Sequence, residues 1–282
     1  MRPHLLRTAA EHRQDRIYSR SERAADVAES AVQRQWRRVL DVIREGGPWH
    51  IVHARALAAV RGLTEVQSEL RTDLIAIAGE AARNARSAIG KLLPRDAVER
   101  LRHRRPVRES LRLREDITGD LLDWLLPTHP ESVLQQVVYS SGWERRFAGL
   151  TRLAPPDVIA SLVANGVQSG EHPYTIARSV LPFVDNYKVS ARRTARTAGM
   201  YVAHEAELRT HEQLGDLVTA YQIHATLDSR TRPEHRRRDG TIYYRRPGAG
   251  QKGFNEMPRP PAEADGTLAF NCRCWISPIL DV

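Results

Sequence analysis

The sequence lacks the usual marks of a secreted or membrane-spanning protein. Only two of its 282 residues are cysteines, Cys272 and Cys274. Residues two apart rarely have the Cα spacing and Cβ directions that a disulfide needs, so we expect reduced thiols or metal ligands rather than a disulfide framework. No apolar run reaches the roughly 18 residues of a membrane span, and the N-terminus has no apolar stretch of signal-peptide length. We therefore expect a protein without a membrane span that is made in a cytoplasm.

Acidic residues are outnumbered, because 43 Lys and Arg face 34 Asp and Glu and leave a net charge of +9. A basic chain often binds a polyanion, most commonly nucleic acid. A GC-rich genome that encodes Arg in place of Lys explains the same number, so the charge alone identifies no partner. Apolar residues make up 41% and charged residues 27%, which is ordinary for a globular protein.

Arginines are concentrated in the segment RLRHRRPVRESLRLR, at residues 100–114. Guanidinium groups neutralise phosphates and release counterions, so one interpretation is a stripe that faces double-stranded DNA. A solvated helix face, or a surface that docks on an acidic partner, is the alternative. The candidate DNA-contact residues are Arg102, Arg104, Arg105, Arg108 and Arg112.

Apolar residues in the first half recur every three or four positions, which is typical of α-helices. Ala28, Val32 and Trp36 begin one such face, which ends before the helix breaker Gly46-Gly47-Pro48. We predict an α-helical N-terminal domain over residues 1–154. Its remaining helical segments are predicted at 49–93, 111–126 and 131–150.

Pro155 and Pro156 mark the predicted boundary with a second domain, residues 155–282. A short helix, a Gly-flanked turn and another helix are expected before residue 184, followed by one long helix over 188–215. From residue 217 the segments VTAYQIHATLD and TIYY alternate in polarity and predict strands, and residues 240–270 are rich in Gly and Pro. The sequence thus predicts a mainly α N-terminal domain followed by a small α+β C-terminal domain with long loops.

Side chains suited to a metal ion are gathered near the C-terminus. Asp228 and His235 lie in ATLDSRTRPEHRRRDG, and both cysteines lie in FNCRCWISP. Thiols two apart on an extended segment point the same way, so with His235 and a fourth ligand they can form a tetrahedral zinc site. Asp228 is the predicted fourth ligand, and His224 is the other candidate. Two plainly buried thiols, with Asp228 paired to Arg230 in a turn, are the alternative.

The same residues carry a resemblance to a known family. The pattern D-x-R-T-x-x-x-H, a later D-G, and then N-C-R-C with a nearby proline resembles the C-terminal signature of the Mu F-like / SPP1 gp7 minor head proteins. An upstream G-x-x-x-G turn and an A-R-T tripeptide are also similar. The resemblance covers about residues 155–280. The matching residues are Gly166, Gly170, Ile176, Ala177, Ala195, Arg196, Thr197, Asp228, Arg230, Thr231, His235, Asp239, Gly240, Asn271, Cys272, Arg273, Cys274 and Pro278.

Four positions depart from the family pattern. Ala198 stands where the family often has Glu, and Ile223 stands where it often has Trp. Ala269 and Phe270 replace the frequent His-Pro before N-C-R-C, which removes one candidate metal ligand. The D-x-R-T, His and N-C-R-C frame is intact.

The resemblance implies a structural protein of a tailed-phage virion, synthesised in the cytoplasm of a bacterial host. It would lie at the portal vertex and inside the head, contact the portal protein and other head proteins, and act in head morphogenesis and in DNA packaging or ejection. We expect no catalytic residue and no small-molecule substrate, because the sequence has no paired acids at acid–base spacing. A metal-dependent nuclease and a free-standing DNA-binding protein are the alternatives.

Overall fold

A computed structural model describes residues 3–61, 65–92, 129–262 and 269–280 of the chain. These residues form two compact units, each assembled from separate stretches of sequence. The helical unit comprises residues 18–75 and 138–199, and the sheet unit comprises residues 1–17, 76–137 and 200–282. Both units combine parts of the predicted regions 1–154 and 155–282, and the boundary at Pro155 stays a prediction. None of the described helices is both long and apolar enough to cross a membrane.

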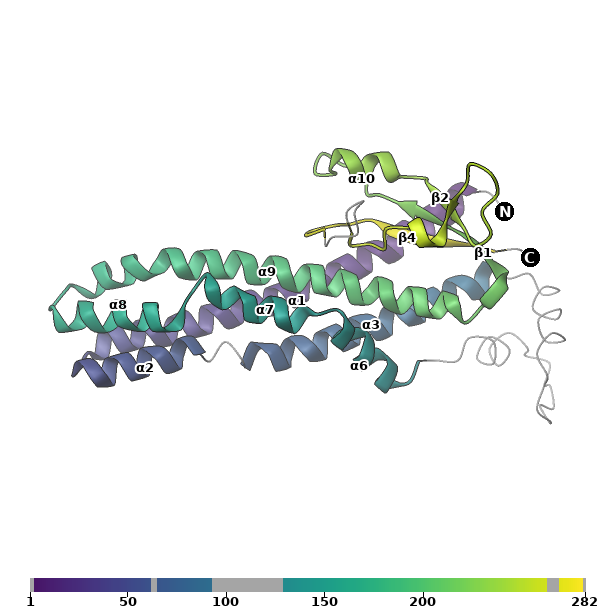
Figure 1. The fold of residues 1–282 in the computed structure, drawn as a ribbon. Helices are drawn as coiled ribbons and strands as arrows, with labels where there is room; N and C mark the ends of the chain where they lie inside the picture. The colour runs from purple at the N-terminus through teal and green to yellow at the C-terminus, as the bar shows by residue number, and fades with distance from the viewer. Residues whose placement is uncertain (1–2, 62–64, 93–128, 263–268, 281–282) are drawn as a thin grey trace. The chain divides into compact units, whose positions relative to one another are not determined.

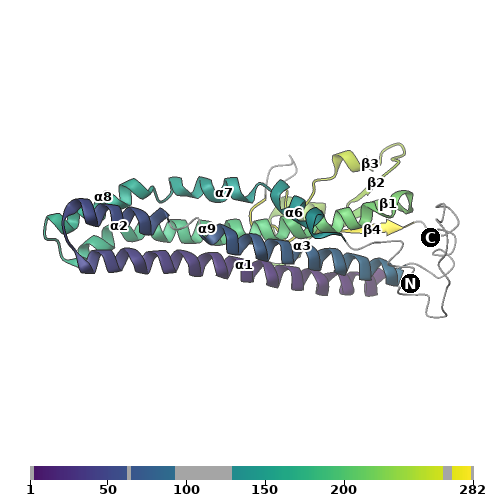
Figure 2. The ribbon, with the colours of Figure 1, turned by 90° about the horizontal axis from the view of Figure 1, so that it is seen from below.

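Long helices dominate the described residues, as the sequence predicts (Figure 1). The helix α1 (Pro3–Glu45) ends where Gly46 and Gly47 adopt positive φ, which confirms the predicted breaker. It is followed by α2 (Trp49–Arg61) and α3 (Glu65–Leu92). Figures 1 and 2 show α2 beside α8 (Pro156–Gln168), and the indole N–H of Trp49 donates to the side chain of Asn165 at 2.9 Å.

Two predicted helical segments are each divided in the structure. The apolar-periodic stretch 49–93 forms α2 and α3, with residues 62–64 outside the described part. The prediction of a single helix over 131–150 was wrong. These residues form two helices, α6 (Glu131–Ser140) and α7 (Trp143–Gly149), and the 3-10 turn η2 (Leu150–Arg152) follows them. Gly142 takes φ +66 between them, a conformation that glycine adopts without steric cost. The predicted helix at 111–126 lies outside the described residues.

One helix, α9 (Pro173–Glu212), replaces two predicted ones, because the sequence predicted a break between them that the structure does not contain. Pro182 lies inside it. Proline removes one backbone hydrogen bond from a helix interior and usually ends or kinks the helix. Here Pro182 is exposed, so water can satisfy the backbone carbonyl that loses its partner. Solvent exposure thus explains why α9 continues through a residue that favours a break.

Small side chains allow α1 and α9 to pack closely within the helical unit. Ala191, Ala195 and Ala198 recur every three or four residues along α9, and all three are buried. A Cβ atom on Gly199 would lie 2.9 Å from the Cβ of Ser21 and 3.2 Å from its Cα. Such a Cβ would clash with Ser21. The backbones of α1 and α9 can come this close only because residue 199 is a glycine.

An ion-pair cluster joins α1 to α9 beside this contact. Arg192 donates to Glu29 at 2.7 Å and to Glu22 at 3.0 Å, and it also pairs with Asp26. Arg196 donates to Glu22 at 2.8 Å. Burial alone would raise the pKa of Glu22, but the hydrogen bond from Arg196 and the nearby charges outweigh it and lower that pKa below its ordinary value. The charged form of Glu22 is therefore favoured by folding.

We expect the mutation Glu22→Gln to make stability less dependent on pH in the acid range. Because folding lowers the pKa of Glu22, its ion pairs stabilise the protein above its ordinary pKa of about 4.5. That contribution is lost as the pH falls through the lower folded value. At pH 6 the variant should melt about 2–4 °C below wild type, equivalent to roughly 1 kcal/mol. Melting curves from pH 6 to pH 3 should converge, whereas the exposed-pair control Asp41→Asn should parallel wild type throughout.

The sheet unit contains a four-stranded sheet of order β3-β2-β1-β4 (Figure 1). The predicted strands appear as β1 (Val218–His224) and β2 (Ile242–Tyr244), which pair antiparallel. The strand β4 (Trp275–Leu280) runs antiparallel along the other side of β1, and the short β3 (Lys252–Gly253) runs parallel to β2. The 3-10 turns η3 (Gly215–Leu217) and η4 (Phe254–Glu256) flank the strands. This confirms the predicted α+β character of the C-terminal part.

One hydrophobic cluster joins the sheet to the helices of its unit. Tyr221 and Ile223 of β1 and Ile276 of β4 pack with Leu208 of α9. Ile89 of α3, which is 1% exposed, belongs to the same cluster although it lies more than 100 residues earlier in the chain. The core of the sheet unit therefore includes a side chain from the first half of the sequence.

Candidate metal centre

The short helix α10 (Pro233–Arg238) carries His235 into the interior of the sheet unit. Pro233 occupies the first turn, where its fixed φ suits a helix start and its missing N–H costs nothing. His235 is only 4% exposed and faces away from solvent, unlike Arg236 and Arg237 beside it. The helix thus presents one imidazole inward from a strongly basic segment.

The two cysteines follow a tight turn that leads into β4. The N–H of Cys272 donates to the carbonyl of Ala269 at 3.2 Å, and Asn271 takes a positive φ of 58°. Asparagine is one of the few residues other than glycine that adopt this conformation readily. The asparagine of N-C-R-C therefore allows the chain to turn before the thiols, and His235 lies across from them.

The three side chains meet in one buried group. The Nδ1 atom of His235 lies 3.2 Å from the Sγ of Cys274 and 3.6 Å from the Sγ of Cys272. All three ligand atoms lie within 4.8 Å of one another, and each residue is at most 5% exposed. A tetrahedral zinc ion would separate such ligand atoms by roughly 3.6–3.8 Å, given its usual Zn–S and Zn–N distances. The spacing therefore fits a zinc ion with a small shift of the imidazole.

The chemistry of the donor set also suits a metal. The thiol of Cys274 donates a hydrogen bond that lowers the pKa of Cys272, and His235 acts in the same direction, although burial opposes both. The same contact and burial raise the pKa of Cys274. The backbone N–H of Cys274 lies 3.4 Å from the Sγ of Cys272 and can stabilise a thiolate there. Soft thiolates with one imidazole are ligands typical of zinc.

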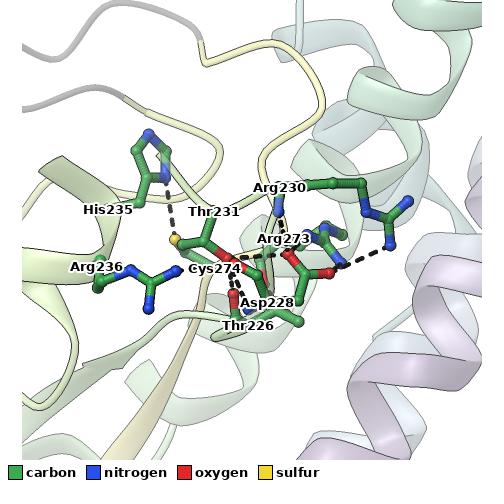
Figure 3. A network of polar contacts seen from close by, with 8 residues as sticks. All are labelled: Thr226, Asp228, Arg230, Thr231, His235, Arg236, Arg273 and Cys274. Atoms are coloured by element: carbon green, nitrogen blue, oxygen red, sulfur yellow. Dashed lines mark hydrogen bonds and ion pairs between the residues drawn. The ribbon is translucent and has the colours of Figure 1, made fainter. Parts of the chain in front are cut away.

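Asp228 is not part of this group. Its carboxylate accepts two hydrogen bonds from the guanidinium of Arg273, at 2.6 and 2.7 Å, and one from the backbone N–H of Arg230 at 2.9 Å (Figure 3). These bonds, with Arg273 the strongest, hold the pKa of Asp228 far below its ordinary value. The structure brings three of the four predicted ligands together and places Asp228 in a salt bridge instead.

His224, the other candidate for the fourth position, is also engaged elsewhere. Its Nε2 atom lies 2.7 Å from the hydroxyl of Ser277, and its ring stacks on Trp275 at 5.3 Å. Within the described part of the chain, only His235, Cys272 and Cys274 form a group that could hold a metal. The predicted DNA-contact residues Arg102, Arg104, Arg105, Arg108 and Arg112 lie outside the described residues.

Sequence reasoning missed the role of Arg273. It lies between the two cysteines, and its side chain and backbone both bond to the loop that contains Asp228. The sequence contains a signal for this role. A basic residue between two candidate ligands does not bind a cation, and it can form an ion pair with a carboxylate such as Asp228. Arg273 and Asp228 are therefore partners, and the carboxylate is not available as a metal ligand.

Other motif residues have clear structural contacts. The carboxylate of Asp239 accepts from the N–H of Ala225 at 2.9 Å, and Gly240, with φ +78, donates from its N–H to Ile223 at 2.8 Å. These two residues anchor the end of β1 to the segment after α10. In the helical unit, a Cβ on Gly166 would lie 2.7 Å from Ile176, so this glycine permits close packing of α8 on α9. The motif thus marks positions where the backbone turns or approaches another element.

Comparison with known proteins gives a consistent assignment. Residues 157–277 match the family described as Phage Mu protein F like protein. The minor head protein GP7 of Bacillus phage SPP1 is 30% identical over 129 residues, which are 44% of this chain and 40% of that protein. The chain therefore spans well under half the length of this curated relative. No solved structure matches the chain. Residues 157–277, which run from the start of α8 into β4 and include the buried His–Cys–Cys group, are therefore similar to the Phage Mu protein F like family.

Proposed function

We propose that this protein is a structural minor component of a tailed-phage head, acting in head morphogenesis. The observation that carries the proposal is the match of residues 157–277 to the Mu F-like family, together with a relative that is itself a minor head protein. The motif residues of that segment serve turns, close packing and a buried ligand group, which are structural tasks. We place the protein in the virion, inside the head near the portal vertex, with the portal protein as its partner and a role in DNA packaging or ejection.

Co-purification of the full chain with the portal protein of the same genome tests this role. A stable complex, sized by light scattering as a portal ring plus several copies of this chain, is the expected result. A chain that stays apart from the portal and other head proteins would overturn the proposal. Nuclease activity on plasmid DNA with zinc, magnesium or manganese, lost in His235→Ala, would replace it with the enzymatic alternative.

We further propose that His235, Cys272 and Cys274 hold a zinc ion that fastens the loops of the C-terminal module. The burial and mutual distances of the three ligand atoms support this role. A bound zinc ion would join α10 to the turn before β4, across a Gly- and Pro-rich connection of more than thirty residues. All three residues are at most 5% exposed, and this burial supports a structural ion that is shielded from water.

Contact with packaged DNA is a separate proposal, supported by the net charge of +9 and by the arginines of residues 100–114. Alanine replacement of Arg102, Arg104, Arg105 and Arg108 in the full chain should weaken binding to duplex DNA and lower its salt dependence by about one to four phosphate contacts. Titration of labelled DNA at several salt concentrations measures both. Portal binding should survive in this variant, and unchanged DNA binding would exclude these arginines from the DNA surface.

A further inference from the structure

We propose that Asp228 is a positioning residue for the thiol pair: it holds Arg273, and through Arg273 it fixes the direction of the cysteines on either side. This inference rests on the proposed zinc site for its effect on metal affinity. Arg273 separates the two cysteines in sequence, so a change in its backbone would move both.

Arg273 is held at two points by the loop 226–231. Its guanidinium forms a two-pronged pair with both oxygens of Asp228, at 2.6 and 2.7 Å. Its backbone carbonyl accepts a hydrogen bond from the hydroxyl of Thr226 at 3.1 Å. A two-pronged pair fixes orientation as well as distance, because both guanidinium nitrogens must align with the carboxylate. The residue between the thiols therefore has little freedom to rotate.

Asp228 is itself held in place by its own loop. Its carboxylate accepts from the backbone N–H of Arg230 at 2.9 Å, and its backbone N–H donates to the hydroxyl of Thr231 at 3.1 Å. The Thr231 hydroxyl in turn donates to the carbonyl of Thr226. The Asp228 side chain is 33% exposed and that of Arg273 16%, so the pair is partly shielded from water. A carboxylate fixed this way is a rigid anchor rather than a mobile surface charge.

The third ligand is connected to the same residue. The guanidinium of Arg236, the neighbour of His235 in α10, donates to the backbone carbonyl of Asp228 at 2.9 Å (Figure 3). Each of the three grouped side chains therefore has a sequence neighbour bonded to Asp228. Figure 3 shows Arg273 directed toward Asp228, while Cys274 is directed toward His235. Asp228 thus bonds to side chains of the residues next to all three ligands without belonging to the ligand group itself.

Groups that orient metal ligands from outside the coordination sphere commonly contribute about 10–100-fold to metal affinity. We expect Asp228→Asn to bind Zn²⁺ about 10–100-fold more weakly than wild type in competition with a chromogenic chelator, using the full chain. Arg273→Lys keeps the charge but loses the two-pronged geometry, so an intermediate loss is expected. The matched control is Asp216→Asn, which removes an exposed carboxylate paired with Arg245 in the same unit and should bind like wild type.

A second readout distinguishes positioning from general stability. Cobalt-loaded wild type should show the thiolate charge-transfer and d–d bands of a tetrahedral site, and Asp228→Asn should shift and weaken them while Asp216→Asn does not. In the metal-free chain, a thiol-reactive disulfide dye should react faster with Asp228→Asn than with wild type, since the two thiols are at most 5% exposed when held. If Asp228→Asn does not fold, the cobalt spectrum and the thiol reaction rate are measured on Arg273→Lys instead.

The outcomes separate the two proposals. If wild type binds zinc and both variants bind it equally well, the positioning role is wrong and the zinc site stands. If wild type binds no zinc, the proposal of a zinc site is wrong, and the positioning role is then tested by the rate of the dye reaction alone. Equal dye rates in wild type and the variants would then overturn it, and faster rates in the variants would support it without a metal.

Discussion

Chelation of zinc is expected to lower the melting temperature of the purified protein by roughly 10 °C. A ligand that binds only the folded state at about a thousand times its dissociation constant stabilises that state by about 4 kcal/mol, and each kcal/mol moves a melting transition by about 2–4 °C in a protein of this size. The thiols and imidazole are close enough to accept the ion with little rearrangement. Among the described residues, the hydrophobic cluster around the two cysteines is small and consists of Ala225, Ala269 and the cysteines themselves, so a bound ion would add much of the local order.

Elemental analysis should find one zinc per chain in wild type and less than a tenth of that in Cys272→Ser. Melting curves with and without a strong chelator should then differ for wild type and coincide for the serine variant. His172→Ala, which replaces an exposed histidine of the helical unit, is the matched control and should retain both the metal and the shift. Absence of stoichiometric zinc, with Cys272→Ser as stable as wild type, would contradict the site.

The second large effect is expected in the helical unit, where Trp143→Ala should destabilise the protein by about 3–5 kcal/mol. Trp143 is fully buried at the start of α7 and packs edge-to-face on Phe147, with ring centroids 5.8 Å apart. Alanine would leave a large cavity, and the helices around it can close such a space only in part. Trp143→Phe keeps most of the apolar volume and should lose less than half as much.

Urea unfolding followed by circular dichroism measures this effect. Tyr139→Ala provides the control, since Tyr139 lies near the end of α6, carries an aromatic ring and is 78% exposed. It should change stability by less than about 0.5 kcal/mol. A Trp143→Ala variant as stable as Tyr139→Ala would show that the ring is not part of the packed core in solution.

Features set by local spacing were predictable from the sequence. The face that begins at Ala28 and Val32 is buried in α1, because the three-and-four spacing records which side of a helix is covered. Features that depend on distant residues were not predictable. The strand β4 pairs with β1 more than fifty residues away, and α9 continues through Pro182 because that residue is exposed. Local sequence records neither pairing partners nor exposure.

The candidate site likewise has features that the sequence predicts and features that depend on the folded geometry. The meeting of His235 with the two cysteines followed from ligand chemistry and from the two-residue period of an extended segment. The place of Asp228 did not, because carboxylates suit both metals and guanidinium groups, and the chain offers both nearby. Geometry decides between them, and here Arg273 presents two donors at once.

Ile89 belongs to the same hydrophobic cluster as the sheet residues Tyr221, Ile223 and Ile276. The segment that matches the family model begins at residue 157, so the sheet within that segment packs on a side chain encoded far upstream. Recombination that exchanged residues 157–277 between relatives would have to preserve a compatible residue at position 89, or leave a void where that side chain packs. We therefore expect a transplanted segment to need a compatible upstream residue in addition to its own sequence.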